Sequence, residues 1–153
     1  MSKLIIISGV AGSGKSTYAE KYVSTHSNTL ILSTDSIRFE LFNTQYPDRE
    51  SEKIIKRTIV ERAIKAASQN IDVIVDSAIV KNKSILRWYR KLIPYFKEAE
   101  LVIIDTPLEK CLYQNSIRDR HVPEDVIREM YSFKEPLNKE IMDSFKTITI
   151  INN

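Results

Sequence analysis

The residues best suited to do chemistry stand near the start of the chain, in the run Gly9-Val10-Ala11-Gly12-Ser13-Gly14-Lys15-Ser16-Thr17. Its first eight residues match G-x-x-x-x-G-K-[S/T], the P-loop pattern. In this pattern the glycines let the backbone fold back, so that its N–H groups surround a phosphate. We expect Lys15 to reach the β- and γ-phosphates of a nucleoside triphosphate and the Ser16 hydroxyl to bind Mg²⁺. The run therefore predicts a nucleotide-binding site.

The residues on either side of this run favour the same interpretation. Residues 4–7 are a short apolar run typical of a buried strand, and apolar residues at three- and four-residue spacing predict a helix over 17–26. All 3 glycines of the chain lie in the motif. The alternative is a glycine-rich turn that precedes a lysine by chance, and the complete motif between a strand and a helix disfavours it.

Two acidic residues are candidates for work beside a bound phosphate. Asp35 follows a predicted strand over 29–33 and is our candidate general base, because a carboxylate there could accept a proton from an attacking hydroxyl. Asp76 follows a predicted strand over 73–75, as a Walker-B acid would, and could hold Ser16 or a magnesium-bound water. The alternative for each aspartate is structural, because aspartate is also a leading N-cap residue.

Three arginines could neutralise phosphate charge. Arg38 stands three residues after Asp35, on the same helical face, and could hold an anionic substrate group through a bidentate contact. Its alternative is a surface pair with Asp35, which would contribute little stability. Arg118 and Arg120 flank the end of a predicted helix, where a mobile lid could close over the γ-phosphate. The alternative for these two is a solvated charge run.

The hydrophobic pattern alternates strands with helices along the chain. Strands are predicted over 4–7, 29–33, 73–75, 101–104 and 147–151, and helices over 17–26, 37–42, 50–69, 83–97, 107–118, 124–134 and 137–142. Thr106 is expected to cap the helix that begins at Pro107, and Pro94 to kink or shorten the helix that contains it. This order is typical of an α/β fold, a doubly wound parallel sheet whose ligands bind beyond the carboxyl ends of the strands.

Composition limits the remaining possibilities. A chain of 153 residues favours a single domain over 1–153, and a net charge of +3 permits an anionic partner without requiring one. The single cysteine, Cys111, cannot form an internal disulfide and is expected to be a small core residue, which favours a reducing, cytoplasmic location. No apolar run approaches the roughly 20 residues of a membrane span, and we expect no signal peptide before the first strand. The oligomeric state is left open.

These clusters together resemble the kinase domain of phage-type polynucleotide 5′-hydroxyl kinases. The resemblance rests on GVAGSGKST, on the run Ser33-Thr34-Asp35-Ser36-Ile37-Arg38, and on a C-terminal stretch that joins 102–107, 115–118 and 122–131. It covers most of the chain and is weakest over 45–69. It implies a P-loop kinase fold with a small helical lid at about 114–124, and transfer of a phosphate from ATP, with Mg²⁺, to a 5′-hydroxyl end of RNA or DNA.

The resemblance also implies roles for single residues. Asp35 resembles the general base of the family, Arg38 the arginine on the 3′-phosphate of the terminal nucleotide, and Arg118 the lid arginine on the donor phosphates. Asp76 and Ser77 resemble an acid-plus-hydroxyl pair beside the substrate tunnel. Val122 and Pro123 would offer an apolar wall to the acceptor base.

The sequence departs from the family in two places. Gln114 stands where a second basic residue is common, so the lid charge is expected to be weaker or to come from Arg120. No glycine follows Gly14, so the phosphatase motif Asp-x-Asp-Gly is absent and we expect a kinase alone. Two other hypotheses stay open, which are a small-molecule or nucleotide kinase of similar fold and a nucleotide-binding module that transfers nothing.

Overall fold

Five parallel strands form the centre of the molecule. The computed structural model describes residues 1–44, 47–119 and 121–153, and its strands are β1 (Lys3–Ser8), β2 (Thr29–Ser33), β3 (Asp72–Asp76), β4 (Glu98–Asp105) and β5 (Thr147–Asn152). They form one sheet in the order β2-β3-β1-β4-β5, and all four pairings are parallel. The carboxyl ends of all five strands therefore meet at one edge, and the predicted α/β architecture is confirmed.

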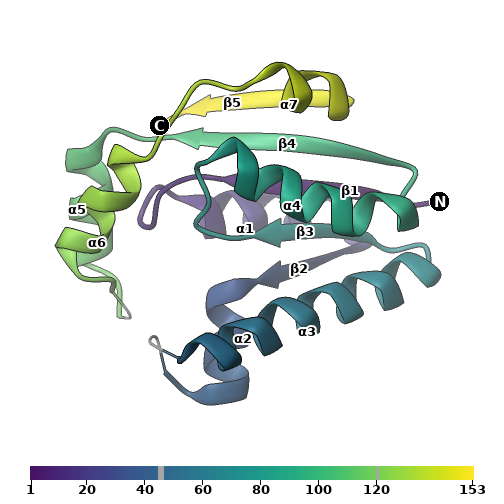
Figure 1. The fold of residues 1–153 in the computed structure, drawn as a ribbon, viewed down its shortest axis with the longest axis horizontal. Coiled ribbons are helices and arrows are strands. Elements are labelled where there is room, and N and C mark those ends of the chain that lie inside the picture. Colours follow the sequence, from purple (N-terminus) through teal and green to yellow (C-terminus); the bar gives the residue numbers. More distant parts are fainter. Residues whose placement is uncertain (45–46, 120) are drawn as a thin grey trace.

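Helices lie on both faces of this sheet and beyond its carboxyl edge. They are α1 (Lys15–Thr25), α2 (Thr34–Phe42), α3 (Arg49–Ser68), α4 (Asn82–Leu92), α5 (Leu108–Ser116), α6 (Glu124–Ser132) and α7 (Lys139–Ser144). Figure 1 shows α1 behind the sheet and α4 in front of it, while α5 and α6 lie together beyond the arrow tips of the strands. This arrangement leaves α5 and α6 next to the loops in which ligands of such sheets bind.

The strand residues point alternately to two hydrophobic clusters, as the period of two in a strand requires. Ile5, Ile7 and Ile74 pack with α1 on one face. Leu4 and Ile6 pack on the other face, in a larger cluster that includes α3 and α4. The inward face of α3 is the one that its sequence pattern predicts: Ile55, Ile59, Ala63 and Ala66.

Two local predictions differ from the structure. The helix predicted over 83–97 ends earlier, at Leu92, which confirms the expected shortening by Pro94, because that residue lacks the N–H that would continue the helix; a single 3-10 turn (Ile93–Tyr95) leads to β4. Thr106 does not cap α5, whose N-cap is Pro107. The buried Thr106 hydroxyl instead donates a hydrogen bond of 2.7 Å to the carbonyl of Ser13. A residue predicted to be structural therefore supports the P-loop.

Across the described ranges, each helix is too short or too polar to cross a membrane.

Candidate functional site

The P-loop between β1 and α1 has a backbone that only glycine adopts readily. Gly12 has φ +83° and Gly14 has φ +107°. A Cβ atom on Gly12 would also lie 2.5 Å from the carbonyl oxygen of Cys111, which no side chain tolerates. Gly14 is the N-cap of α1, and no described side chain accepts a hydrogen bond from the first N–H groups of that helix. These donors, with the positive end of the helix dipole, suit an anion.

Side chains from outside the P-loop hold its carbonyl groups in place. Gln114 donates to the carbonyl of Gly12 at 2.6 Å, and Asn153 donates to the carbonyl of Ser13 at 2.9 Å, beside Thr106. Sequence reasoning missed Asn153, and it treated Gln114 only as a missing charge. No local pattern identifies either residue, because their partners lie more than one hundred positions away.

Lys15 is a buried cation without a carboxylate partner in the described structure. Its side chain is 8% exposed, and its Nζ donates to the carbonyl of Val10 at 3.2 Å. Burial lowers its pKa, the charge of Asp76 opposes that shift, and the nearby positive charge of Arg118 adds to it. An ammonium group held in this way is strongly stabilised when phosphate oxygens arrive, which fits the position of Lys15 in the P-loop.

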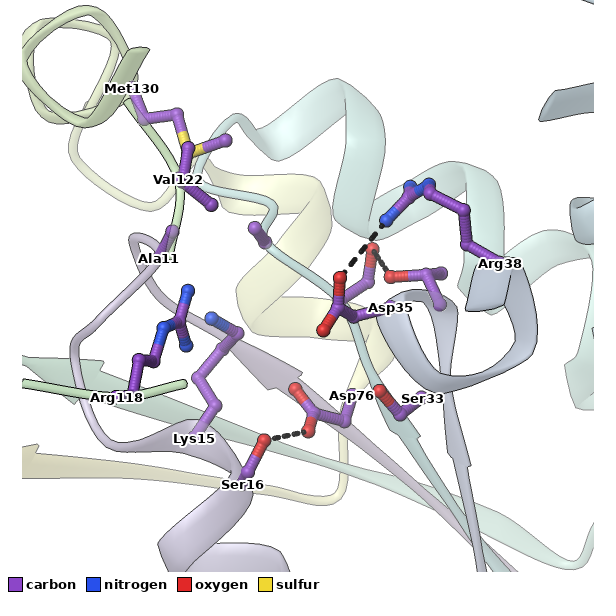
Figure 2. Close-up of a pocket in the computed structure, with 13 residues that line it drawn as sticks. Ala11, Lys15, Ser16, Ser33, Asp35, Arg38, Asp76, Arg118, Val122 and Met130 are labelled. Atoms are coloured by element: carbon purple, nitrogen blue, oxygen red, sulfur yellow. Dashed lines mark hydrogen bonds and ion pairs between the residues drawn. The ribbon is translucent and has the colours of Figure 1, made fainter. Parts of the chain in front are cut away.

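Ser16 and Asp76 meet at the carboxyl edge of the sheet. The Ser16 hydroxyl donates to a carboxylate oxygen of Asp76 at 2.9 Å, and Asp76 itself is 5% exposed at the end of β3 (Figure 2). One hydroxyl beside one carboxylate, facing the P-loop, fits the way Mg²⁺ is held in such sites, where phosphates and water complete the shell.

Asp35 and Arg38 lie across the pocket from Lys15. Both belong to α2, whose N-cap is Ser33, with its side chain accepting from the N–H of Ser36. The alternative in which Asp35 only caps this helix is therefore wrong. Asp35 is 51% exposed and directed into the pocket (Figure 2), so its carboxylate is free to meet a ligand.

The pair of Arg38 with Asp35 that one alternative predicted is present, but Arg38 is mostly buried rather than exposed on the surface. Only 19% of its side chain is exposed, because it lies between two carboxylates. Its Nε donates to Glu52 of α3 at 2.9 Å, and its Nη1 lies 3.5 Å from Asp35. Glu52 therefore fixes the arginine while the other end of the guanidinium faces the pocket. Sequence reasoning missed Glu52, which stands fourteen residues away on another helix.

The segment after α5, which the resemblance predicts to be a lid, contributes Arg118 and an apolar contact. Figure 2 shows the guanidinium of Arg118 directed toward the space above Lys15. Val122 and Met130 line the pocket, whereas Pro123 is the exposed N-cap of α6 and does not, so the predicted apolar wall consists of Val122 and Met130. Arg120 lies outside the described residues.

Asn115, which belongs to the stretch 115–118 of the family resemblance but was given no role there, holds the segment after α5 in position. Its buried side chain donates to the carbonyl of Val122 at 2.7 Å and accepts from the N–H of the same residue at 2.9 Å. A single amide group thus fixes both main-chain groups of Val122, which is why an asparagine suits this place.

Two pockets meet at the P-loop lysine. The first, of about 210 Å³, is lined by Ala11 and Ser77 together with Asp35, Arg38 and Asp76. The second, on the other side of the loop, is lined by Gly12, Gly14, Lys15, Ser16, Thr17, Gln114, Ile117 and Arg118. Lys15, Ser16 and Arg118 line both pockets. A phosphate at these three residues would be reachable from both sides.

Comparison with known proteins agrees with this geometry. The family model described as an AAA domain matches residues 4–137. The chain belongs to that family. Its sheet and flanking helices form an α/β P-loop kinase fold.

A relative at the level of sequence supports the resemblance to polynucleotide kinases. A protein of Autographa californica nuclear polyhedrosis virus, named as a bifunctional polynucleotide kinase/RNA ligase, is 26% identical over 161 residues, which cover 99% of this chain. The chain spans only 21% of the length of that relative.

Two solved structures share the fold. A chain of the Pnkp1/Rnl/Hen1 RNA repair complex matches with a TM-score of 0.76 and 22% identity, over 86% of this chain and 43% of that one. A sugar kinase from Janibacter sp. HTCC2649 matches with a TM-score of 0.67 and 17% identity, over 99% of this chain and 86% of that one. At these identities the likeness shows the fold and leaves the acceptor open.

Proposed function

We propose that the protein transfers the γ-phosphate of ATP to the 5′-hydroxyl of a polynucleotide. The observation that carries this proposal is the meeting of two pockets at Lys15, Ser16 and Arg118. One pocket ends in the glycine loop, which suits the donor. The other ends in the pair Asp35–Arg38, which suits a hydroxyl close to an anionic group.

The donor side would hold the triphosphate through the P-loop N–H groups and Lys15. Ser16 and Asp76 would hold Mg²⁺, which when bound neutralises the charge that develops between the β- and γ-phosphates. Arg118 would close over the γ-phosphate from the lid, at the side away from Asp76. These groups act by position and charge, which is nearly all that phosphoryl transfer asks of a protein.

The transfer itself would need one proton acceptor. The Asp35 carboxylate takes the proton of the 5′-hydroxyl as that oxygen forms a bond to the γ-phosphorus. The bond between the γ-phosphorus and the β,γ-bridging oxygen breaks, and ADP leaves with the electron pair. Arg38 would hold the 3′-phosphate of the same nucleotide, so that the 5′-hydroxyl lies beside Asp35, while Val122 and Met130 pack against the base.

One alternative keeps the same donor chemistry with a small acceptor. The Janibacter sugar kinase shares the fold over nearly the whole chain, and a pocket of about 210 Å³ would hold a small alcohol. Arg38 and the viral relative favour the polynucleotide, since a sugar without an anionic group offers nothing for an anion-binding arginine to bind. A nucleotide-binding module without transfer would have no use for Asp35 at the pocket.

The test is an acceptor panel. The protein is incubated with γ-labelled ATP, Mg²⁺ and, separately, a nucleoside, a nucleoside 3′-monophosphate, a 5′-hydroxyl oligonucleotide, a 5′-phosphorylated oligonucleotide and a set of sugars, and products are resolved by thin-layer chromatography. We expect label on the 3′-monophosphate and on the 5′-hydroxyl oligomer, and none on the 5′-phosphorylated one. Label on a sugar alone would replace this proposal with the sugar-kinase alternative.

A further inference from the structure

We call the pocket that contains Asp35 and Arg38 the acceptor pocket. A groove continues from it across the surface between α3 and α4. We call it the basic groove and define it by Lys56 of α3 and Arg87 and Lys91 of α4. Residues 84, 87 and 91 follow one another at three- and four-residue spacing, so they share one face of α4. Trp88, which is 6% exposed, forms the floor beneath the cations.

The positive charge in this groove is uncompensated. Five charged side chains line it: Arg38, Glu52, Lys56, Arg87 and Lys91. The only carboxylate among them, that of Glu52, is paired with Arg38 at 2.9 Å. Within residues 1–44, 47–119 and 121–153, no carboxylate lies within ion-pair distance of the other three cations.

Lys91 shows the effect of this crowding. Partial burial lowers its pKa, and the like charges of Lys56 and Arg87 lower it further. Its ammonium group lies 5.8 Å from the centre of the Trp88 ring, and this contact leaves the positive charge of Lys91 in place. An anion between these side chains would relieve the repulsion. Without a ligand, three like charges around one groove oppose folding slightly, which favours a binding function for them.

The basic groove and the acceptor pocket are joined at three residues. Thr34, Arg38 and Ser77 line both, and the hydroxyls of Thr34 and Ser77 lie 3.4 Å apart. Arg38 therefore stands at the boundary, with the pocket on one side and the three unpaired cations on the other. A ligand that enters past Arg38 with one anionic group has a place for a second in the groove.

We propose that the basic groove binds a backbone phosphate of the acceptor strand on the 3′ side of the terminal nucleotide. This inference rests on the proposed function and extends it from the terminal nucleotide of the substrate to the nucleotides that follow it. A polynucleotide is the acceptor with anions repeated at regular spacing, which matches Arg38 followed by a second cation cluster. A small acceptor ends in the first pocket and would leave the groove without a role.

The experiment compares acceptors of different length with a variant that removes two groove charges. Arg87→Gln combined with Lys91→Gln is paired with a control, Lys21→Gln combined with Lys97→Gln, which removes the same charge from exposed positions outside the groove. Binding of a 5′-hydroxyl hexanucleotide labelled with fluorescein at its 3′ end is followed by anisotropy over a salt series. Turnover is measured with that hexamer and with a nucleoside 3′-monophosphate.

We expect the groove variant to bind the hexamer about ten- to a hundredfold more weakly than wild type and the control. The slope of log affinity against log salt should fall by about 0.7 for each phosphate contact that is lost. Turnover of the nucleoside 3′-monophosphate should not change, because that acceptor does not reach the groove. The preference for the hexamer over the monophosphate should shrink by the same factor as the binding.

The outcomes separate this inference from the function beneath it. Suppose the wild type transfers phosphate and the groove variant shows normal hexamer binding and kinetics. That result would overturn the proposal that the groove binds the strand and would leave the proposed kinase function standing. Hexamer binding that depends on the groove, without transfer to any 5′-hydroxyl, would overturn the kinase and support the groove as a strand-binding site. An equal loss in the control variant would show only a general charge effect and would overturn the groove. Wild type that neither binds nor labels the hexamer would overturn both.

Discussion

The two pockets that share Lys15 are built in different ways. On the donor side the P-loop backbone does most of the positioning, with Gly12 and Gly14 at positive φ and the carbonyls of the loop held by Thr106, Gln114 and Asn153. On the acceptor side, side chains of α2 and α3 hold one another through ion pairs around Arg38.

The difference explains how one fold can serve several acceptors. A backbone cradle for a phosphate depends on the path of the chain, so every protein with this path can keep it. An acceptor site made of partly exposed side chains changes with single substitutions that leave the sheet intact. The sugar kinase and the RNA repair structure share this fold with the chain at 17% and 22% identity. We therefore expect substitutions on the acceptor side to change chemistry or specificity without a change in nucleotide binding.

The largest effect is expected at Asp35. Asp35→Asn keeps the size of the side chain but cannot accept the proton, so transfer should fall by about 10²–10⁴-fold. Nucleotide binding and the melting temperature should stay close to wild type, because Ser33 caps α2. Initial rates of label transfer and a thermal melt are the measurements. Wild-type turnover in this variant would remove Asp35 from the role of base.

Lys15→Met tests the donor side. Methionine keeps most of the buried volume and removes the ammonium group, so turnover should fall by roughly 10²–10³-fold. In contrast to Asp35→Asn, nucleotide affinity should fall as well, which titration calorimetry with ADP and Mg²⁺ would show. If Lys15→Met bound ADP as wild type does, the assignment of Lys15 to nucleotide binding on the donor side would be wrong.

Arg118 belongs to both pockets, and its removal should affect turnover more than affinity. Its charge matters most when the γ-phosphate is in transit, so Arg118→Ala should lower kcat by roughly ten- to a hundredfold with little change in KM for ATP. Arg128→Ala is a suitable control, because Arg128 is exposed on α6 and pairs with Glu124. Equal kinetics for the two variants would make the segment near Arg118 a solvated connector.

A smaller effect is expected where the lid is anchored. Asn115→Ala leaves the main-chain N–H and carbonyl of Val122 without their partner, which should lower the free energy of unfolding by about 1–3 kcal/mol. The lid should close less often, and KM for the acceptor should rise more than KM for ATP. Denaturant titration and steady-state kinetics would check this. A rise confined to ATP would place the anchoring effect on the donor side instead.

On both sides the residues that line the pockets were largely predictable from the sequence, and the residues that hold them in place were not. The P-loop is a contiguous run, and the spacing of its glycines and lysine predicts a phosphate-binding loop. The strands around it are apolar runs that end in polar residues. Glu52 and Asn153 carry no such pattern, because each meets its partner through the tertiary fold. Thr106 was misread for the same reason, since its local sequence predicts a cap while a distant carbonyl takes its hydroxyl. Asn115 and Met130 lie in the stretches that carry the family resemblance, which assigned them no role.

The central claim is that Arg38 selects an acceptor with an anion next to the reacting hydroxyl. The most direct test is the ratio of kcat/KM for a nucleoside 3′-monophosphate to that for the nucleoside, in wild type and in Arg38→Ala. A charge-assisted contact of about 1.5–3 kcal/mol predicts a wild-type ratio of about ten to over a hundred, which should fall to near one in the variant. A ratio that is the same in both proteins would contradict the account.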